Sequence, residues 1–153
     1  MAKPSDKPAT NGLDLGMLPS LLGYHLRRAQ VAVFQHFAAT MGEAEITPGQ
    51  FGVLLVIRNN SGLSQTQLGN ALGIDRSTVV AVIDRLEARG LVVRAPSPTD
   101  RRSHALRLSE EGAQTLRKLE EMVRAHERHI ARGLSREDQA RLITLLDRLA
   151  SSG

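Results

Sequence analysis

Cysteine is missing from the 153 residues of this chain, aromatic residues make up only 3% of it, and no long apolar run occurs. Without thiols the chain can form no disulfide, no thiol redox switch and no zinc site built on thiolates, which is compatible with a reducing cytoplasm. The densest apolar run, residues 53–57, is far too short to span a bilayer, and residues 1–12 lack the apolar core of a secretory signal. We therefore expect a cytoplasmic protein with no membrane partner.

Motifs of the common enzyme classes are missing as well. The sequence has no phosphate-binding glycine loop, no Gly-x-Ser-x-Gly elbow and no His-Glu-x-x-His pair, which argues against an enzyme. His126 and His129 lie one helical turn apart and could be imagined as metal ligands together with Glu127, but the arginines that flank them would repel a cation. We interpret this segment as an exposed charged helix face, and we expect no catalytic residue, no metal and no cofactor.

Positive charge, in contrast, is present in local excess. The formal net charge is +4, and residues 85–107 hold six arginines against two acidic residues. Such a cluster can be an ordinary solvent-exposed charged surface, or it can be a surface that binds a polyanion such as DNA. The overall composition, with 41% hydrophobic and 24% charged residues, is that of an ordinary globular domain.

Apolar residues that recur every three or four positions predict four of the helices. Thr47, Ser109 and the pair Ser135 and Asp138 supply capping residues for the last three of them. The predicted helices cover residues 18–41, with Pro19 near the start, then 48 to about 60, 110 to about 133, and 136 onwards. The last helix carries an apolar face of Leu142, Ile143, Leu145, Leu146 and Leu149.

Residues 64–89 have the features of a helix-turn-helix. Ser64 caps a short helix, Gly73 breaks it, and Asp75 caps a second helix that runs through Ala88. The following segment, 91–108, predicts a hairpin, which would be the wing of a winged helix. Residues 91–94 are rich in β-branched residues, residues 95–100 form a loop with two prolines, and residues 105–108 alternate apolar residues.

The second of these helices places small polar residues at its start, where a recognition helix meets the major groove. If Val79, Ile83 and Leu86 face the core, the residues left outward are Arg76, Ser77, Thr78, Ala81 and Arg85. Arg76 could reach guanine or phosphate, Ser77 and Thr78 could donate to phosphate or base edges, and the methyl group of Ala81 could touch thymine. Two further candidate DNA contacts, Ser64 and Gln65, begin the preceding helix.

The tip of the predicted wing carries adjacent guanidinium groups. Arg101 and Arg102 suit a narrow, electronegative minor groove. Asp100 would be repelled by phosphate, so we expect it to organise the wing by holding a neighbouring arginine in a bidentate pair.

Three stretches of the chain combine into one specific pattern: LGNALGIDRSTV at 68–79, IDRLEARGLV at 83–92, and DRRS at 100–103 followed by LRLSEEG at 106–112. With them the chain resembles the MarR family of bacterial winged helix-turn-helix regulators from about residue 18 to residue 149. The resemblance implies a recognition helix at 75–89, a wing at 91–108, and repression of transcription that a small ligand relieves. Family members often place polar residues where this chain has Val80 and Ala81, so base readout there is expected to depend on apolar contacts and shape.

The resemblance also implies a homodimer with intertwined terminal helices. These helices carry more Leu, Val and Ile than one small winged domain could cover, which independently favours a two-fold dimer. The expected fold is mainly α with a small β-wing. After a disordered arm over 1–12, a single domain over 13–153 would combine dimerisation helices at 13–45 and 110–153 with a winged-helix DNA-binding lobe at 47–108.

All four aromatic residues fall between positions 24 and 51, where the family has its effector pocket. Candidate ligand-binding residues in this region are Tyr24, His25, Arg28, His36 and Phe51. Arg28 follows Tyr24 by one helical turn, so guanidinium and ring could hold an aromatic or anionic effector, an aromatic acid or an acyl-CoA thioester. Ordinary core packing is the alternative for these residues, and it is the interpretation we favour for Phe34 and Phe37.

The sequence therefore predicts a regulator that binds double-stranded DNA as a homodimeric repressor and leaves a pseudo-palindromic operator when a small ligand binds. The alternative is a winged-helix module that binds DNA or protein without effector control.

Overall fold

A computed structural model describes residues 12–153, so all but the last residue of the arm predicted for residues 1–12 lies outside the described residues. The chain falls into two compact units, one that ends at Gln35 and one that spans His36–Gly153. The boundary lies within the first long helix, α1 (Leu22–Met41). In the part of the chain that is described, no helix is long and apolar enough to cross a membrane.

The first unit contains a short 3-10 helix, Leu18–Ser20, and the first part of α1. We predicted one helix from Leu18, but the backbone at Leu21 is extended, with ψ of 129°, so the α-helix begins at Leu22. Pro19 lies in the first turn of the 3-10 helix, where its missing N–H costs nothing. Several large apolar side chains of this unit are exposed: Leu22, Leu26, Val31 and Phe34.

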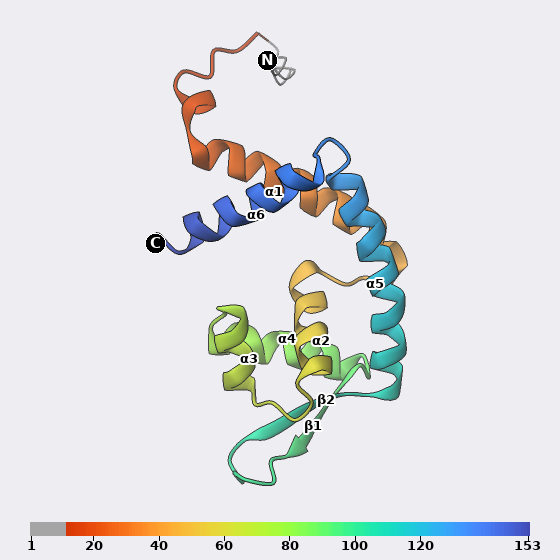
Figure 1. Cartoon of the computed structure of the whole chain (residues 1–153). Coiled ribbons are helices and arrows are strands. Elements are labelled where there is room, and N and C mark those ends of the chain that lie inside the picture. The colour runs from red at the N-terminus through yellow and green to blue at the C-terminus, as the bar shows by residue number, and fades with distance from the viewer. Residues whose placement is uncertain (1–11) are drawn as a thin grey trace. The chain divides into compact units, whose positions relative to one another are not determined.

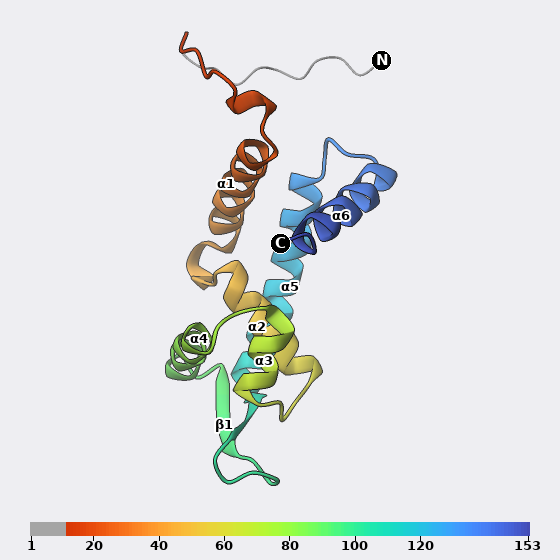
Figure 2. The ribbon, with the colours of Figure 1, turned by 90° about the vertical axis from the view of Figure 1, so that its left-hand side faces the viewer.

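The second unit holds most of the elements and confirms a mainly α fold with a small β-wing (Figure 1). After a 3-10 helix, Gly42–Ala44, its helices are α2 (Pro48–Asn59), α3 (Gln65–Leu72), α4 (Arg76–Ala88), α5 (Glu110–Ile130) and α6 (Arg136–Ala150). Its strands are β1 (Val92–Pro96) and β2 (His104–Leu108). α3 and α4 lie beside each other near the base of the hairpin, as the two views show (Figure 1 and Figure 2).

The helix starts are fixed locally, by the capping residues that the sequence predicts. The hydroxyls of Thr47 and Ser64 each accept the backbone N–H of the glutamine three positions later, and the side-chain oxygen of that glutamine accepts the backbone N–H of the capping residue. Ser135 and Asp138 form the same capping box at α6. Gly73 ends α3 in the left-handed region, with φ of 64°, which glycine adopts at low cost. Ser64 and Gly73 thus set where α3 begins and ends, and the Asp75 side chain caps the start of α4 by accepting the N–H of Thr78.

The wing is a two-stranded antiparallel ribbon in which Val92 faces Leu108 and Pro96 faces His104. The strands differ slightly from the predicted ranges 91–94 and 105–108: β1 continues through Ala95 and Pro96, and β2 begins one residue earlier, at His104. Pro96 is tolerated because β1 has only one neighbouring strand, so the missing N–H breaks no bond between strands. On its other side β2 pairs with the connection between α2 and α3, where the Leu106 N–H donates to the carbonyl of Leu63 at 2.9 Å. The wing is thereby tied to the helix-turn-helix by backbone bonds.

One continuous core lies inside the second unit. Its fully buried side chains come from α2, α3, α4, β2 and α5: Leu54, Ile57, Leu68, Ile83, Leu86, Leu106, Leu116 and Leu119. Gly112 lets α5 approach this core, because a Cβ atom there would lie 2.0 Å from the carbonyl oxygen of Leu91. By contrast, α6 has no buried residue, and its predicted apolar face is exposed.

Candidate nucleic-acid interface

The outward face of α4 is the centre of the candidate interface. Val79, Ile83 and Leu86 are at most 1% exposed, which confirms the predicted inward face. The five residues predicted to face outward are all exposed: Arg76, Ser77, Thr78, Ala81 and Arg85. The helix therefore offers a cationic and polar start and a small apolar middle, a surface that a major groove can accept.

Asp75 caps α4 with more hydrogen bonds than a cap needs. Its Oδ1 accepts the backbone N–H of Thr78 at 3.0 Å and the hydroxyl of Ser77 at 2.5 Å, while its Oδ2 accepts the hydroxyl of Thr78 at 2.6 Å. These bonds, first that from Ser77 and then those from Thr78, hold the pKa of Asp75 well below its usual range, so the carboxylate is ionised at neutral pH. The sequence predicted the cap but not the capture of both hydroxyls.

Ser64 and Gln65, the candidates at the start of α3, are half-buried. The Ser64 hydroxyl accepts the N–H of Gln67 at 3.1 Å, which leaves its hydrogen free to donate. The Gln65 side-chain oxygen is buried with no hydrogen-bond partner within residues 12–153. Of the two residues, Ser64 has the clearer donor for a phosphate.

The wing tip presents the two predicted guanidinium groups to solvent. Arg101 and Arg102 are exposed, and neither forms an ion pair in the described residues. Asp100 organises this turn, but the expected bidentate pair with an arginine is not formed. Its Oδ1 instead accepts the backbone N–H of Arg102 at 2.9 Å, and its carbonyl accepts the N–H of Ser103 at 3.2 Å. A carboxylate that bonds to the backbone shapes the loop and leaves both arginines available.

Two other arginines of the basic stretch 85–107 have structural partners. Arg94 of β1 bridges Asp84, at 2.6 Å, and Glu87, at 2.5 Å, and so ties the wing to α4. Arg89, just after α4, donates to the carbonyls of Ala44 and Glu45 at 2.8 and 3.0 Å. The positive charge that the sequence shows is therefore only partly available to DNA.

Three of the candidate effector residues lie in the first unit, on α1. The Arg28 guanidinium lies 5.6 Å from the centre of the Tyr24 ring, as their spacing predicts, and the His25 ring meets the Tyr24 ring edge to face at 5.3 Å. His25 also bonds through Nε2 to the carbonyl of Pro19 at 2.8 Å. The same helix has a shallow hollow along one face, lined by Arg27, Gln30, Val31, Phe34 and Gln35.

The other two candidates, His36 and Phe51, belong to the second unit. Phe51 is partly buried and packs against the core. His36 bonds to His126, with 2.7 Å between the two Nδ1 atoms, and its ring stacks on His129 at 3.8 Å. The interpretation of His126 as part of an exposed face is wrong, since it is 2% exposed, whereas His129 is exposed. Burial lowers the pKa of His126, and nearby His36 lowers it further while Glu127 opposes the shift.

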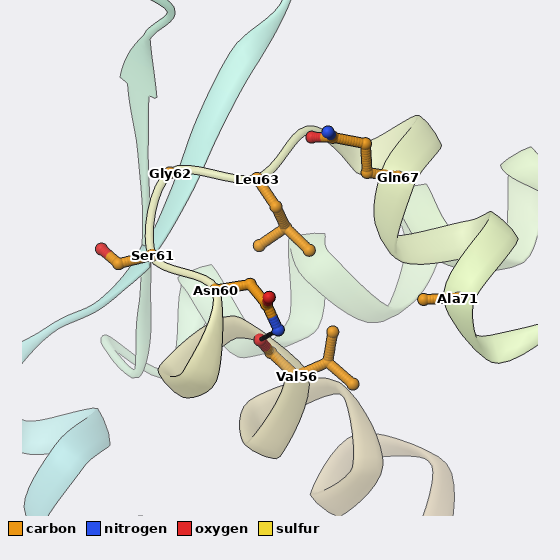
Figure 3. A pocket seen from close by; sticks show the side chains of 7 residues that line it. All are labelled: Val56, Asn60, Ser61, Gly62, Leu63, Gln67 and Ala71. Atoms are coloured by element: carbon orange, nitrogen blue, oxygen red, sulfur yellow. Dashed lines mark hydrogen bonds between the residues drawn. The ribbon is translucent and has the colours of Figure 1, made fainter.

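The prediction of core packing holds for only one of the two phenylalanines on α1. Phe37 is 5% exposed, but Phe34 is 50% exposed. A separate open hollow lies between the end of α2 and α3, where the Asn60 amide donates to the carbonyl of Val56 (Figure 3). It contains none of the predicted effector residues.

Comparison with known proteins places this geometry among transcriptional regulators. A sequence model described as the MarR family matches residues 44–103. A putative transcriptional regulatory protein for the hcr operon of Thauera aromatica is 44% identical, over 97% of this chain and 92% of that protein. The transcriptional repressor CouR bound to a 23-mer DNA duplex is 42% identical, over 90% of this chain and 98% of that one, with a TM-score of 0.85. CouR bound to p-coumaroyl-CoA is 40% identical, over 90% and 97%, with a TM-score of 0.83.

Proposed function

The chain belongs to the MarR family of transcriptional regulators, and from this premise we propose that it is a homodimeric repressor whose operator binding is relieved by an aromatic acid or an aromatic acyl-CoA thioester. The dimer would bind a pseudo-palindromic operator with half-sites about 10 bp apart, one helical turn of DNA. The repressor would act in the cytoplasm, and we assign no catalytic reaction to the chain.

The observation that carries the DNA role is the two-sided character of α4. Its apolar side is locked into the core by Val79, Ile83 and Leu86, so the polar side is held outward on a rigid element. Arg76 on this side and the wing-tip arginines supply the charge that phosphate requires. We refer to the outward residues of α4 and the two wing-tip arginines as the DNA-reading surface. It comprises Arg76, Ser77, Thr78, Ala81, Arg85, Arg101 and Arg102.

The effector role rests on α1 and on the ligand of a relative. The Arg28 guanidinium near the Tyr24 ring is a pair that can hold a carboxylate or phosphate next to an aromatic group. CouR, which is similar over most of this chain, binds p-coumaroyl-CoA, a ligand that contains both groups. This supports a ligand that is aromatic at one end and anionic at the other.

Selection of binding sites tests the DNA role. Duplexes are selected from a random pool with the purified full chain, and the affinities for a selected and a scrambled duplex are then measured over a range of salt concentrations. We expect selected sites with two related half-sites and a steep salt dependence for both duplexes. Equal affinity for the selected and scrambled duplexes would contradict a sequence-specific regulator.

The effector role is tested by thermal shift and by release from the selected duplex. p-Coumaroyl-CoA and p-coumarate are the probes, and CoA alone is the control. We expect Arg28→Ala to weaken the response to the ligand without loss of DNA binding, while Arg27→Ala, the matched control one residue earlier, retains both. A chain that binds the duplex but responds to none of the probes would instead support a winged-helix module without effector control.

A further inference from the structure

Asp75 and the two hydroxyls that it holds carry an inference about which bases the chain selects. A helix cap needs only a side-chain oxygen for a backbone N–H, and Ser64 and Ser135 supply such an oxygen with a single hydroxyl. Asp75 adds two bonds that its capping role does not require, from Ser77 and Thr78. Both donors belong to the DNA-reading surface.

The direction of these bonds follows from the chemistry of the groups. An ionised carboxylate can only accept, and a hydroxyl has one hydrogen to donate. With both hydroxyl hydrogens directed at Asp75, the exposed sides of Ser77 and Thr78 present only oxygen lone pairs. Our expectation that these two residues donate to phosphate is therefore opposite to the polarity that the structure gives them.

Lone pairs discriminate among base edges in the major groove. The donors there are the amino groups of adenine, at N6, and of cytosine, at N4, whereas guanine offers N7 and O6 and thymine offers O4, all acceptors. A hydroxyl that can only accept can bind the amino group of adenine or cytosine. On guanine or thymine it would face another acceptor atom, which is unfavourable.

We infer that Asp75 is a specificity-determining positioning residue: by holding the hydroxyls of Ser77 and Thr78 as acceptors, it makes the recognition helix select amino-bearing base edges where these side chains meet the groove. This inference rests on the proposed function, because it requires Ser77 and Thr78 to face the operator. The test must therefore separate the two claims.

The test compares the sites that variants select from the same random duplex pool. Asp75→Asn keeps a good helix cap, but the amide NH₂ must donate where the carboxylate accepted, so one hydroxyl hydrogen turns outward. We expect the wild-type chain to prefer adenine or cytosine at one or two positions of each half-site by about fivefold, a typical effect for one base position. Asp75→Asn should lose this preference there and accept guanine or thymine.

Controls distinguish base choice from folding and from charge. Asp75→Ser, a second capping residue, releases both hydroxyls and should relax the same positions, and melting curves show whether each variant is folded. Glu121→Gln removes an exposed negative charge from α5 that forms no ion pair in the described residues, and it should leave every base preference unchanged. In a Thr78→Ala, Ser77→Ala background, Asp75→Asn should change no base preference, since its effect passes through those hydroxyls.

Each outcome decides one claim. If Ser77→Ala and Thr78→Ala leave all base preferences unchanged, these side chains do not face the groove and this part of the proposed function fails. If they change the preferences but folded Asp75→Asn and Asp75→Ser select the wild-type sites, the contact role stands and the inference about Asp75 is overturned. A wild-type preference for guanine or thymine at the positions that Ser77 and Thr78 control would overturn it as well.

Discussion

The winged-helix lobe of this chain buries its apolar side chains, whereas the terminal helices expose many of theirs. In the lobe, residues 47–108, the apolar faces of α2, α3 and α4 and the wing are buried within one protomer. On α6 every apolar side chain is exposed, and the first part of α1 exposes Leu22, Leu26, Val31 and Phe34. Both regions have the same helical periodicity of apolar residues, so the pattern alone does not tell which face the protomer covers itself.

In the proposed homodimer, the lobe would fold within each protomer, and the exposed apolar residues of the terminal helices would be covered by the other protomer. A contiguous exposed apolar face on a soluble protein marks an interaction surface. The lobe can present its DNA-reading surface without help, whereas α6 has a face that suits a second copy of the chain. Folding of the lobe and pairing of the protomers should therefore respond to different substitutions.

The largest effect is expected from charges placed on the exposed face of α6. In the Leu146→Glu, Leu149→Glu double variant, two carboxylates would have to be buried at the dimer interface, so we expect monomers in sedimentation experiments. A monomer loses the gain from engaging two half-sites together, and affinity for the selected duplex should fall by about 100-fold or more.

Thr144→Glu is the matched control for this experiment, because it adds a carboxylate to the same helix outside the apolar face. It should remain a dimer and bind normally. A double variant that stays dimeric, or a monomer that binds a two-half-site duplex at full strength, would contradict the division of roles.

A substitution where α5 packs against the winged-helix lobe should instead lower the free energy of unfolding. In Gly112→Ala the new Cβ would meet the carbonyl oxygen of Leu91, which belongs to the backbone and cannot move aside cheaply. We expect the free energy of unfolding in denaturant to fall by about 3 kcal/mol, the upper part of the usual range for overpacking. Gly133→Ala, where a Cβ meets nothing within 4 Å, is the control and should change stability little. Equal stability of the two variants would contradict the close approach of α5.

Much of the fold could be predicted from the sequence, because helix starts and inward helix faces depend on short-range rules. Caps such as Ser64 and Ser135 act within three residues, and the inward face of α4 follows from the helical repeat of Val79, Ile83 and Leu86. The bond between His36 and His126 joins residues 90 positions apart, and no local pattern indicates such a pair. Phe34 was misjudged because helical periodicity identifies an apolar face without showing what covers it.

The candidate site was predicted in outline and not in its chemistry. Arg101 and Arg102 are exposed as expected, but Asp100 shapes the wing through a backbone N–H and not through a guanidinium. Two arginines of the basic stretch have partners within the chain. Arg89 donates to backbone carbonyls between α1 and α2, and Arg94 forms ion pairs with the two acidic residues of α4. Side-chain partners of this kind depend on rotamers and on tertiary placement, which residue spacing does not specify.

The wing arginines should affect DNA binding alone. Replacing Arg101 and Arg102 with alanine removes two charges from each wing, and so four from a dimer bound to its operator. Binding to all duplexes should weaken, and the slope of log affinity against log salt should decrease by about 4. Stability in denaturant and the dimer should be unchanged. Arg117→Ala, on the exposed side of α5, is the control. A double variant that binds every duplex as the wild-type chain does would remove the wing from the interface.

The smallest effect concerns pH and the buried histidine of α5. Because burial lowers the native pKa of His126, the unfolded chain binds more protons as pH falls below the ordinary histidine value. Its contribution to stability is therefore present above about pH 6.5 and is lost as pH falls through the lowered native pKa. His126→Asn cannot titrate and should show a flatter dependence of unfolding free energy between about pH 5 and 7. His104→Asn is the matched control, and identical slopes for wild type and His126→Asn would contradict the prediction.

Reciprocal binding of effector and operator tests the proposed function most directly. The affinity of the dimer for its selected duplex is measured by fluorescence anisotropy with and without saturating p-coumaroyl-CoA, and the affinity for p-coumaroyl-CoA is measured with and without the duplex. Linkage requires that each ligand weaken the other by the same factor, and we expect that factor to be at least about fivefold. Tight binding of the thioester that is the same with and without the duplex would contradict a repressor relieved by this effector.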